Sequence, residues 1–306
     1  MADPRDWAVG IDGGGTKTKL LAVDPAGKVV LERIGGPSNL CSNSRETVRT
    51  NMGQLLDQLR RQTGGVRVGG LCLGSAGLVA KEAETFFREM VAPYAEKVLV
   101  CNDAYITVFA NIGEGNSLVV TAGTGSICYG KALTGEMFRA GGWGHLMGDE
   151  GSGYDIGWTA LHQIARYHDE ERPLPSYFRA FCRELRVDSF EDLVAFIHER
   201  YNQKGQIASL ARLVSDSAER GDEAAVGVLD ICMERLVELC ALVVRRLQLG
   251  GAFFVRMNGS ILLRSAAGPR FEAAMKRRYP ACTLLPIDRE AALGAAYLAR
   301  QEMART

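Results

Sequence analysis

The chain has 306 residues, more than one compact domain usually holds, so we expect two domains. Hydrophobic residues make up 47% and charged residues 24%, which is ordinary for a soluble globular protein. Lys plus Arg and Asp plus Glu both number 36, and a net charge of zero gives no electrostatic basis for binding nucleic acid or an anionic membrane.

The sequence also predicts a compartment. No run approaches the roughly 18 apolar residues of a membrane span. The opening, MADPRDWAVGIDGG, carries charges and passes at once into a predicted strand, unlike a secretory signal. The eight cysteines never form CxxC, and several lie in apolar stretches where cysteine usually behaves as a small core residue. We therefore expect a cytoplasmic protein without a zinc site and without a membrane or nucleic-acid partner.

A glycine-rich turn follows the first predicted strand. The runs DWAVGID, KTKLLAVD and GKVVLERI predict three strands of an antiparallel meander, and DPAG marks the second turn. A Rossmann fingerprint or a P-loop should lead into a helix, but the segment 16–23 alternates like a strand. The turn still suits phosphate, since glycines allow close approach and Thr16 and Lys17 offer donors. Asp12 suits Mg²⁺ or its water shell. A tight hairpin without function fits the loop equally well.

An acidic residue follows the next informative strand. KVLVCNDAYITVFAN predicts a buried strand over 98–101 that ends at Asn102 and Asp103 and leads into a helix. In α/β sheets, binding sites lie beyond the carboxyl ends of strands, which is where Asp103 falls. The carboxylate could cap the helix, a role worth about 1 kcal/mol. It could instead orient an acceptor hydroxyl and take its proton during phosphoryl transfer.

A second loop of the same character lies about a hundred residues on. Residues 118–130, LVVTAGTGSICYG, predict a strand, a loop of Thr, Gly and Ser, and another strand. Two such loops, each opening a set of strands, indicate a duplicated nucleotide clamp.

The segment 140–157, AGGWGHLMGDEGSGYDIG, is too rich in glycine for a regular element and predicts a loop of unusual backbone shape. Trp143 offers a flat apolar face, and Asp149 and Glu150 offer acceptors for hydroxyls, a combination suited to a sugar. His145 with Asp149 could suggest a metal site, but no third ligand stands at a suitable spacing.

The rest of the chain is predicted to be largely helical, with helices at 153–170, 176–201, 205–220 and 223–249. The charged segment 168–202 is interpreted as a helical insertion with solvated faces. A third glycine turn, in FFVRMNGSILL at 253–263, is either an ordinary turn or a turn against a base or ribose. We expect one domain over 1–115 plus 288–306 and another over 116–287.

The order of these motifs resembles the superfamily of actin, Hsp70 and sugar kinases. The resemblance covers nearly the whole chain, from GIDGGGTKT through CNDAY, TAGTGS and MNGS to the closing helix DREAALGAAYLAR. It implies an α/β fold of two RNase H-like (actin-like ATPase) domains with ATP held in the cleft between them. The small residues of the closing helix suit the close packing that such a helix needs.

The segment GGWGHLMGDEGS closely resembles N-acetylglucosamine kinases of the BadF/BadG/BcrA/BcrD ATPase group, and GGPSNL, CNDA and TAGTGS match in order. The resemblance implies ATP- and Mg²⁺-dependent phosphorylation of the 6-hydroxyl of an N-acetylated amino sugar, foremost N-acetylglucosamine, by a homodimer. It implies that Asp103 is the catalytic base and also touches the acceptor hydroxyl, and that Asp12 acts on Mg²⁺ through water. The residues implied to line the sugar, besides Asp103, are Asn39, Ser126, Ile127, Gly142, Trp143, Gly144 and Asp149. Those implied for the nucleotide are Gly13, Gly14, Gly15, Thr16, Lys17, Thr124, Gly125, Ala218 and Gly259.

Four alternatives stay open. An N-acetylmuramic acid kinase would need room for a lactyl ether, and the loop LGSAGL at 73–78 falls where the family has a loop near the acyl group. A glucosamine kinase fits less well, because those compared lack the Trp-Gly-His part of the loop. An activator of a radical dehydratase would carry an iron–sulfur cluster at a dimer interface, with Cys128 as a candidate ligand. A non-catalytic sugar sensor is the last.

Overall fold

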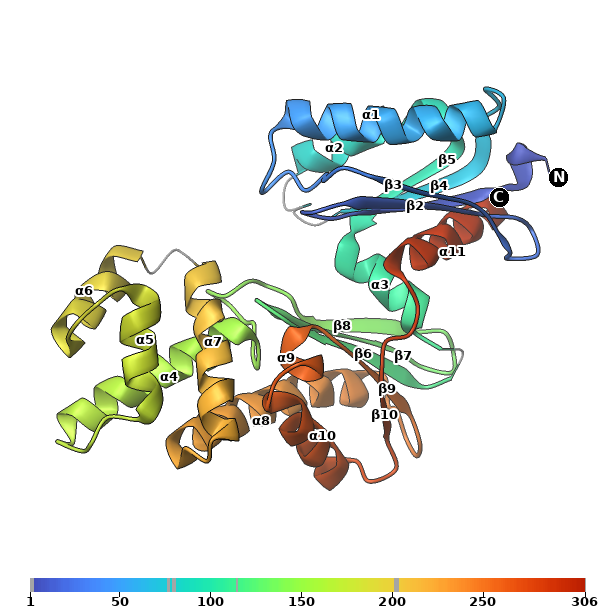
Figure 1. Ribbon diagram of the computed structural model, residues 1–306. Coiled ribbons are helices and arrows are strands. Elements are labelled where there is room, and N and C mark those ends of the chain that lie inside the picture. The colour runs from blue at the N-terminus through green and yellow to red at the C-terminus, as the bar shows by residue number, and fades with distance from the viewer. Residues whose placement is uncertain (1–2, 76–77, 79–80, 114, 201–203, 306) are drawn as a thin grey trace. The chain divides into compact units, whose positions relative to one another are not determined.

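The computed structural model describes residues 3–75, 78, 81–113, 115–200 and 204–305. The chain forms two compact units, coloured by residue number in Figure 1. Unit 1 comprises Met1–Asn111 and Asp288–Thr306, and unit 2 comprises Ile112–Ile287. None of the helices among the described residues combines the length and apolar character needed to cross a membrane.

The sheet of unit 1 has five strands in the order β3-β2-β1-β4-β5. They are β1 (Ala8–Gly13), β2 (Thr18–Val23), β3 (Val29–Gly35), β4 (Val68–Ser75) and β5 (Ala95–Asn102). The first three form the predicted antiparallel meander, and β4 and β5 run parallel to β1. Every residue of β4 is buried, as expected for a strand covered by helices on both faces.

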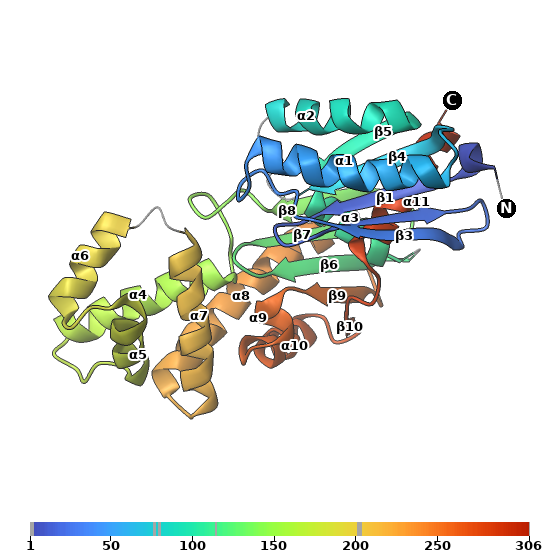
Figure 2. The same cartoon turned by 45° about the horizontal axis from the view of Figure 1, so that its top comes forward.

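Helices cover both faces of this sheet. In Figures 1 and 2, α1 (Arg45–Gln62) and α2 (Lys81–Val91) lie on one face, and α3 (Asp103–Asn111) and α11 (Ala291–Ala304) on the other. Two short 3₁₀ turns, Pro4–Asp6 and Ala92–Tyr94, complete the unit. The small residues of α11 serve close packing here, since a Cβ added to Gly294 would come 2.0 Å from the Ile106 carbonyl oxygen of α3.

Unit 2 repeats the topology of unit 1. Its strands are β6 (Ser117–Ala122), β7 (Ser126–Lys131), β8 (Met137–Gly141), β9 (Phe254–Asn258) and β10 (Thr283–Pro286). Their order is β10-β9-β6-β7-β8, with β6, β7 and β8 antiparallel and β9 and β10 parallel to β6. The two RNase H-like domains are therefore confirmed. The two predicted phosphate loops occupy equivalent positions, one joining β1 to β2 and the other β6 to β7.

Seven helices in the described part of unit 2 surround its core. They are α4 (Gly153–Asp169), α5 (Ser176–Leu185), α6 (Phe190–Arg200), α7 (Lys204–Glu219), α8 (Glu223–Arg246), α9 (Ser260–Leu263) and α10 (Ala267–Arg278). The single helix predicted over 176–201 is wrong. The backbone turns at Arg186, which has a left-handed φ of 58° and ends α5 before α6 begins.

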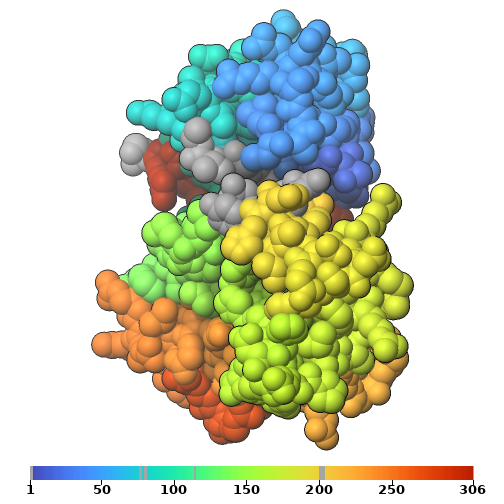
Figure 3. All heavy atoms as spheres, turned by 90° about the vertical axis from the view of Figure 1, so that its left-hand side faces the viewer, coloured from blue at the N-terminus to red at the C-terminus, as the bar shows by residue number. Residues whose placement is uncertain are grey.

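The insertion is helical, and it forms much of the face of unit 2 that Figure 3 shows in yellow-green to yellow. Its charged residues are largely exposed, in keeping with the solvated faces that the sequence indicated. Tyr177, Phe181 and Leu193 are nonetheless buried in the core of unit 2. The insertion is thus an integral layer of the unit, and its last predicted residues lie outside the described ranges.

Candidate active site

The carboxyl edge of the unit 1 sheet gathers the predicted acidic residues. Gly13 at the end of β1 stands opposite Ser75 at the end of β4, which in turn stands opposite Asn102 at the end of β5. The parallel strands therefore end together and bring Asp12 and Asp103 to one edge. Burial raises the pKa of Asp103. The pKa of Asp12 is raised first by burial and then by the charge of Asp103, so the two carboxylates interact.

The Asp103 carboxylate is not needed to cap α3. Asn102 immediately precedes the helix, and its Oδ1 accepts a hydrogen bond from Ala104 N at 2.9 Å. This is the bond that an N-cap residue makes. Asp103 Oδ1 accepts from the same N–H, also at 2.9 Å. The cap is therefore present without the Asp103 carboxylate, which is half-buried at the strand end.

The first predicted phosphate loop is a tight turn that is hydrogen-bonded to the segment after β3. Gly14 N donates to the Lys17 carbonyl at 3.1 Å, which leaves Gly15 and Thr16 at the exposed tip. The Gly14 carbonyl accepts from Asn39 N at 3.2 Å. A Cβ on Gly15 would lie 3.9 Å from Asn39 Nδ2. The structure therefore brings Asn39 beside the loop, although the two are more than twenty residues apart in sequence.

The glycine-rich loop of unit 2 has the unusual backbone that its sequence indicated, but it is shorter than the predicted 140–157. It spans residues 141–152, because Ala140 lies inside β8, which ends at Gly141, and residues 153–157 form the first turn of α4. Positive φ values occur at Gly141, Gly142, Gly144 and Gly151, where glycine carries no steric penalty. Asp149 has a φ of 70°, uncommon for a residue with a side chain. The loop joins β8 to α4, whose N-cap Ser152 accepts from Asp155 N.

The glycine-rich loop is hydrogen-bonded to the second predicted phosphate loop. Ser126 is the centre of this junction: its N–H donates to Asp149 Oδ1 at 3.1 Å, and its hydroxyl donates to the Glu150 carbonyl at 2.7 Å. Its carbonyl accepts from Gly142 N at 3.0 Å. A Cβ on Gly142 would come 2.5 Å from the Ile127 side chain, so Ile127 also packs against the loop.

Trp143 and His145 differ in their surroundings. The Trp143 side chain is exposed, and the guanidinium of Arg139 lies 4.1 Å from its ring centroid. His145 packs edge-on against Tyr154. His145 Nε2 and Glu150 Oε2 are buried and lack hydrogen-bond partners within the described ranges. No group of three His, Cys, Asp or Glu residues among those described is arranged to hold a metal.

Asp149 is almost completely buried and has a cationic partner that the sequence did not reveal. Lys204 Nζ at the start of α7 lies 2.6 Å from Asp149 Oδ2. A single lysine at the start of a charged helix carries no distinguishing sequence signal. With Oδ1 accepting from Ser126 N, both oxygens of this predicted sugar ligand have protein partners.

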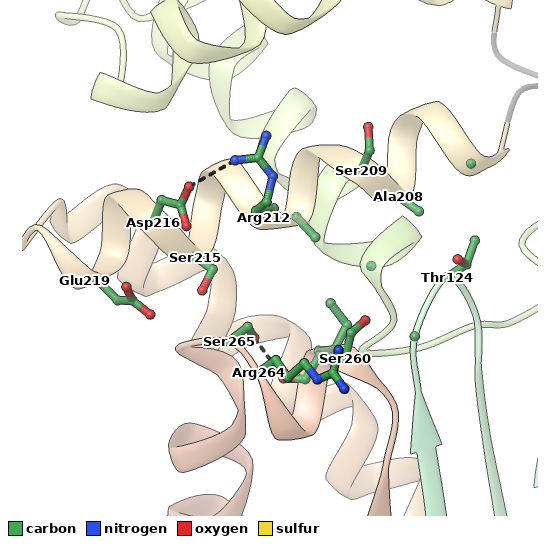
Figure 4. A pocket seen from close by; sticks show the side chains of 15 residues that line it. Thr124, Ala208, Ser209, Arg212, Ser215, Asp216, Glu219, Ser260, Arg264 and Ser265 are labelled. Carbon is green, nitrogen blue, oxygen red and sulfur yellow. Dashed lines mark hydrogen bonds and ion pairs between the residues drawn. The ribbon is translucent and has the colours of Figure 1, made fainter.

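A cavity of about 610 Å³ lies in unit 2 beside the second phosphate loop. Figure 4 shows Thr124 at the tip of the β6–β7 turn, with Ser209 and Ala208 of α7 above it and Ser260 at the start of α9. The turn before α9 needs glycine, because Gly259 has a φ of 92° and its Cβ would come 2.2 Å from the Ala122 carbonyl oxygen.

Most of the polar residues that line this cavity were not predicted. They are Ser209, Arg212, Ser215, Asp216, Glu219, Ser260, Arg264 and Ser265. Those on α7 recur at helical spacing, a pattern equally typical of a solvated face. Predicted Ala218 instead lines a neighbouring cavity of about 770 Å³, which shares Glu219 and Ser265 with the first.

Cys128 is poorly placed to ligate an iron–sulfur cluster at a dimer interface. It is fully buried on β7, where burial raises the pKa of its thiol with a further contribution from Cys240. A cysteine that ligates a metal at a subunit interface must be accessible and must ionise to the thiolate.

The loop at 73–78, predicted to lie near the acyl group, includes residues 76 and 77, which are outside the described ranges.

The chain is similar over nearly its whole length to three known proteins. It is 31% identical to an N-acetylmuramic acid/N-acetylglucosamine kinase of Clostridium acetobutylicum, over 97% of this chain and 99% of that protein. It is 27% identical to an N-acetyl-D-glucosamine kinase of Dictyostelium discoideum, over 96% and 98%. A solved structure from Chromobacterium violaceum has the same fold, with a TM-score of 0.68 and 23% identity over 96% of this chain and 99% of that one.

Residues 9–299 match the family model that describes the BadF/BadG/BcrA/BcrD ATPases. This match spans both phosphate loops, the Asp103 strand end, the glycine-rich loop and most of α11. The chain thus belongs to the BadF/BadG/BcrA/BcrD ATPase family.

Proposed function

We propose that this protein is an ATP-dependent kinase that phosphorylates the 6-hydroxyl of an N-acetylated amino sugar, foremost N-acetylglucosamine. The observation that carries the proposal is the Ser126 junction, which bonds the predicted phosphate loop of unit 2 to the loop predicted to bind the sugar. The names of the two relatives above support the substrate class. The name of the Clostridium relative also favours N-acetylmuramic acid as a second acceptor.

The nucleotide is proposed to bind to both phosphate loops. Thr16 and Thr124 would hold phosphates, and glycines 13–15 and Gly125 let backbone groups approach them. The cavity beside Thr124 would take the adenosine, with the Gly259 turn on one side. Ala218 would act from the adjoining cavity.

Magnesium fits the carboxyl edge of unit 1. Asp12 and Asp103 are half-buried there, and the pKa of Asp12 is raised by burial and, to a smaller extent, by the charge of Asp103. A hard divalent cation prefers carboxylate oxygens and would relieve this repulsion. We propose that Asp12 holds the ion through water. When bound, Mg²⁺ would supply positive charge to the phosphoryl oxygens.

The sugar is proposed to lie against the glycine-rich loop, with Asn39 as a further contact. Trp143 would supply an apolar face, and backbone at Gly142 and Gly144 allows close approach. The unpartnered atoms His145 Nε2 and Glu150 Oε2 support a polar ligand here, because buried polar atoms require hydrogen bonds. Asp149 would share Oδ2 between Lys204 and a sugar hydroxyl, as a carboxylate oxygen accepts more than one bond.

Asp103 is proposed as the general base. It would accept the proton of the 6-hydroxyl while that oxygen forms a bond to the γ-phosphorus and ADP leaves. The assembly is proposed to be a homodimer, which sedimentation analysis would test.

The substrate class can be tested by ADP release with Mg·ATP. The panel comprises N-acetylglucosamine, N-acetylmuramic acid, N-acetylmannosamine, glucosamine, glucose and a reaction without sugar. We expect turnover confined to the N-acetyl sugars. ADP formed at the same rate without sugar would contradict the kinase proposal and indicate an ATPase that acts on a protein partner.

The pH dependence follows from the raised pKa of Asp103. A base works only when deprotonated, so kcat/KM should fall as pH decreases through this raised pKa. The acid limb should therefore lie above the value of an ordinary aspartate, about pH 4. The measurement is the pH profile of kcat/KM for the sugar at saturating ATP, with far-UV circular dichroism at each pH as the folding control. An acid limb at or below the ordinary value would contradict the assignment.

A further inference from the structure

Lys204 is a charged residue near the second phosphate loop that has no part in the nucleotide site proposed above. It is the first residue of α7, and the next residue, Gly205, lines the 610 Å³ cavity. Its Nζ lies 2.6 Å from Asp149 Oδ2. The Asp149 side chain is only 3% exposed, whereas the Lys204 side chain is 30% exposed. The lysine therefore reaches a buried carboxylate from a position that remains open to solvent.

The ammonium of Lys204 lies directly against the phosphate loop. A Cβ built on Gly125 would come 2.9 Å from Lys204 Nζ and 2.7 Å from Asp149 Oδ1. A side chain at this position would therefore have to displace the ion pair. The residues next to both partners of this contact, Thr124 before Gly125 and Gly205 after Lys204, line the cavity.

The two cations that line the cavity are placed differently from Lys204. Arg212 lies two turns along α7 and pairs with Asp216 at 3.3 Å. Arg264 is exposed and follows α9. Lys204 is therefore the cation at the phosphate loop itself. An ammonium is a strong donor to phosphate oxygens, and the flexible lysine stem lets Nζ shift without moving the helix.

We propose that Lys204 binds the phosphates of the nucleotide, and that Asp149 holds its ammonium beside Gly125 in the nucleotide-free protein. This inference rests on the proposed function. It differs from a purely structural role, in which Lys204 only neutralises the buried carboxylate of Asp149. The two roles predict different dependence on the phosphate groups of the ligand.

The test is calorimetric titration of Mg·ADP and of adenosine into wild-type protein and the Lys204→Met and Lys204→Arg variants. Methionine keeps the length of the side chain and removes its charge. For Lys204→Met we expect ADP affinity to fall about tenfold or more, the effect of losing one charge-assisted hydrogen bond, with adenosine affinity within about twofold of wild type. Lys204→Arg should recover part of the loss. Lys131→Met at the far end of β7 changes the net charge equally and should leave both affinities unchanged.

The double variant Asp149→Asn/Lys204→Met separates the two roles, because it removes both charges of the ion pair. It also keeps the test valid if the single methionine variant does not fold. If Lys204 contacts the phosphates, the double variant should retain the selective loss of ADP affinity. Recovery of wild-type ADP affinity, or equal losses for ADP and adenosine, would overturn the proposal. Failure of wild-type protein to bind either ligand would instead contradict the proposed nucleotide site.

Discussion

Replacing Asp103 by Asn should lower kcat by about 10²–10⁴-fold, the usual contribution of a general base, while sugar affinity stays near that of wild type. The physical reason is that the amide cannot take the proton of the attacking hydroxyl, although it keeps the shape of the carboxylate and can still bond to the hydroxyl. The measurements are single-turnover phosphoryl transfer and calorimetric titration of N-acetylglucosamine.

This substitution separates catalysis from helix capping. Asn is as good an N-cap as Asp, so Asp103→Asn should keep the stability of α3. The matched variant Asn102→Ala removes the side chain that caps α3 and should cost about 1 kcal/mol of stability, with only a small effect on kcat. Near-normal turnover in Asp103→Asn would show that Asp103 is not the base.

Replacing Gly294 by Ala should destabilise unit 1 by about 3 kcal/mol or more, because the added methyl group meets two backbone atoms. Its Cβ would come 2.0 Å from the Ile106 carbonyl oxygen and 2.5 Å from Ala110 N. Neither atom can move without displacing α3, which begins at Asp103. We therefore expect a lower midpoint for the unfolding of unit 1 and a lower kcat, measured by urea titration and by turnover.

The same substitution at another helical glycine provides the control. Gly53 lies within α1, and a Cβ there would meet no atom within 4 Å. Gly53→Ala should therefore stabilise the protein, by up to about 1 kcal/mol, because alanine is the better helix former. The two variants should shift the unfolding midpoint in opposite directions. An unchanged or higher midpoint for Gly294→Ala would contradict the close packing of α11 on α3.

The sequence alone determined the features that depend on neighbouring residues. Alternating runs separated by turn signals predicted the β1–β2–β3 meander, and two Gly- and Thr-rich turns predicted the hairpins that occupy equivalent positions in the two units. The position of Asp103 at a strand end followed from a buried run leading into a helix. The resemblance drawn from these motifs is confirmed by the family match over residues 9–299.

Only the tertiary structure decided which of these residues meet. The parallel pairing of β1, β4 and β5 brings Asp103 to the same edge as Asp12, and strand pairing over such separations depends on long-range packing rather than local pattern. The break at Arg186 depends on a left-handed backbone that an arginine does not signal. The pairing of Lys204 with Asp149 likewise depends on how α7 packs beside the glycine-rich loop. In the sequence, a charged residue at the start of a helix is typical of a solvent-exposed side chain and does not indicate its partner.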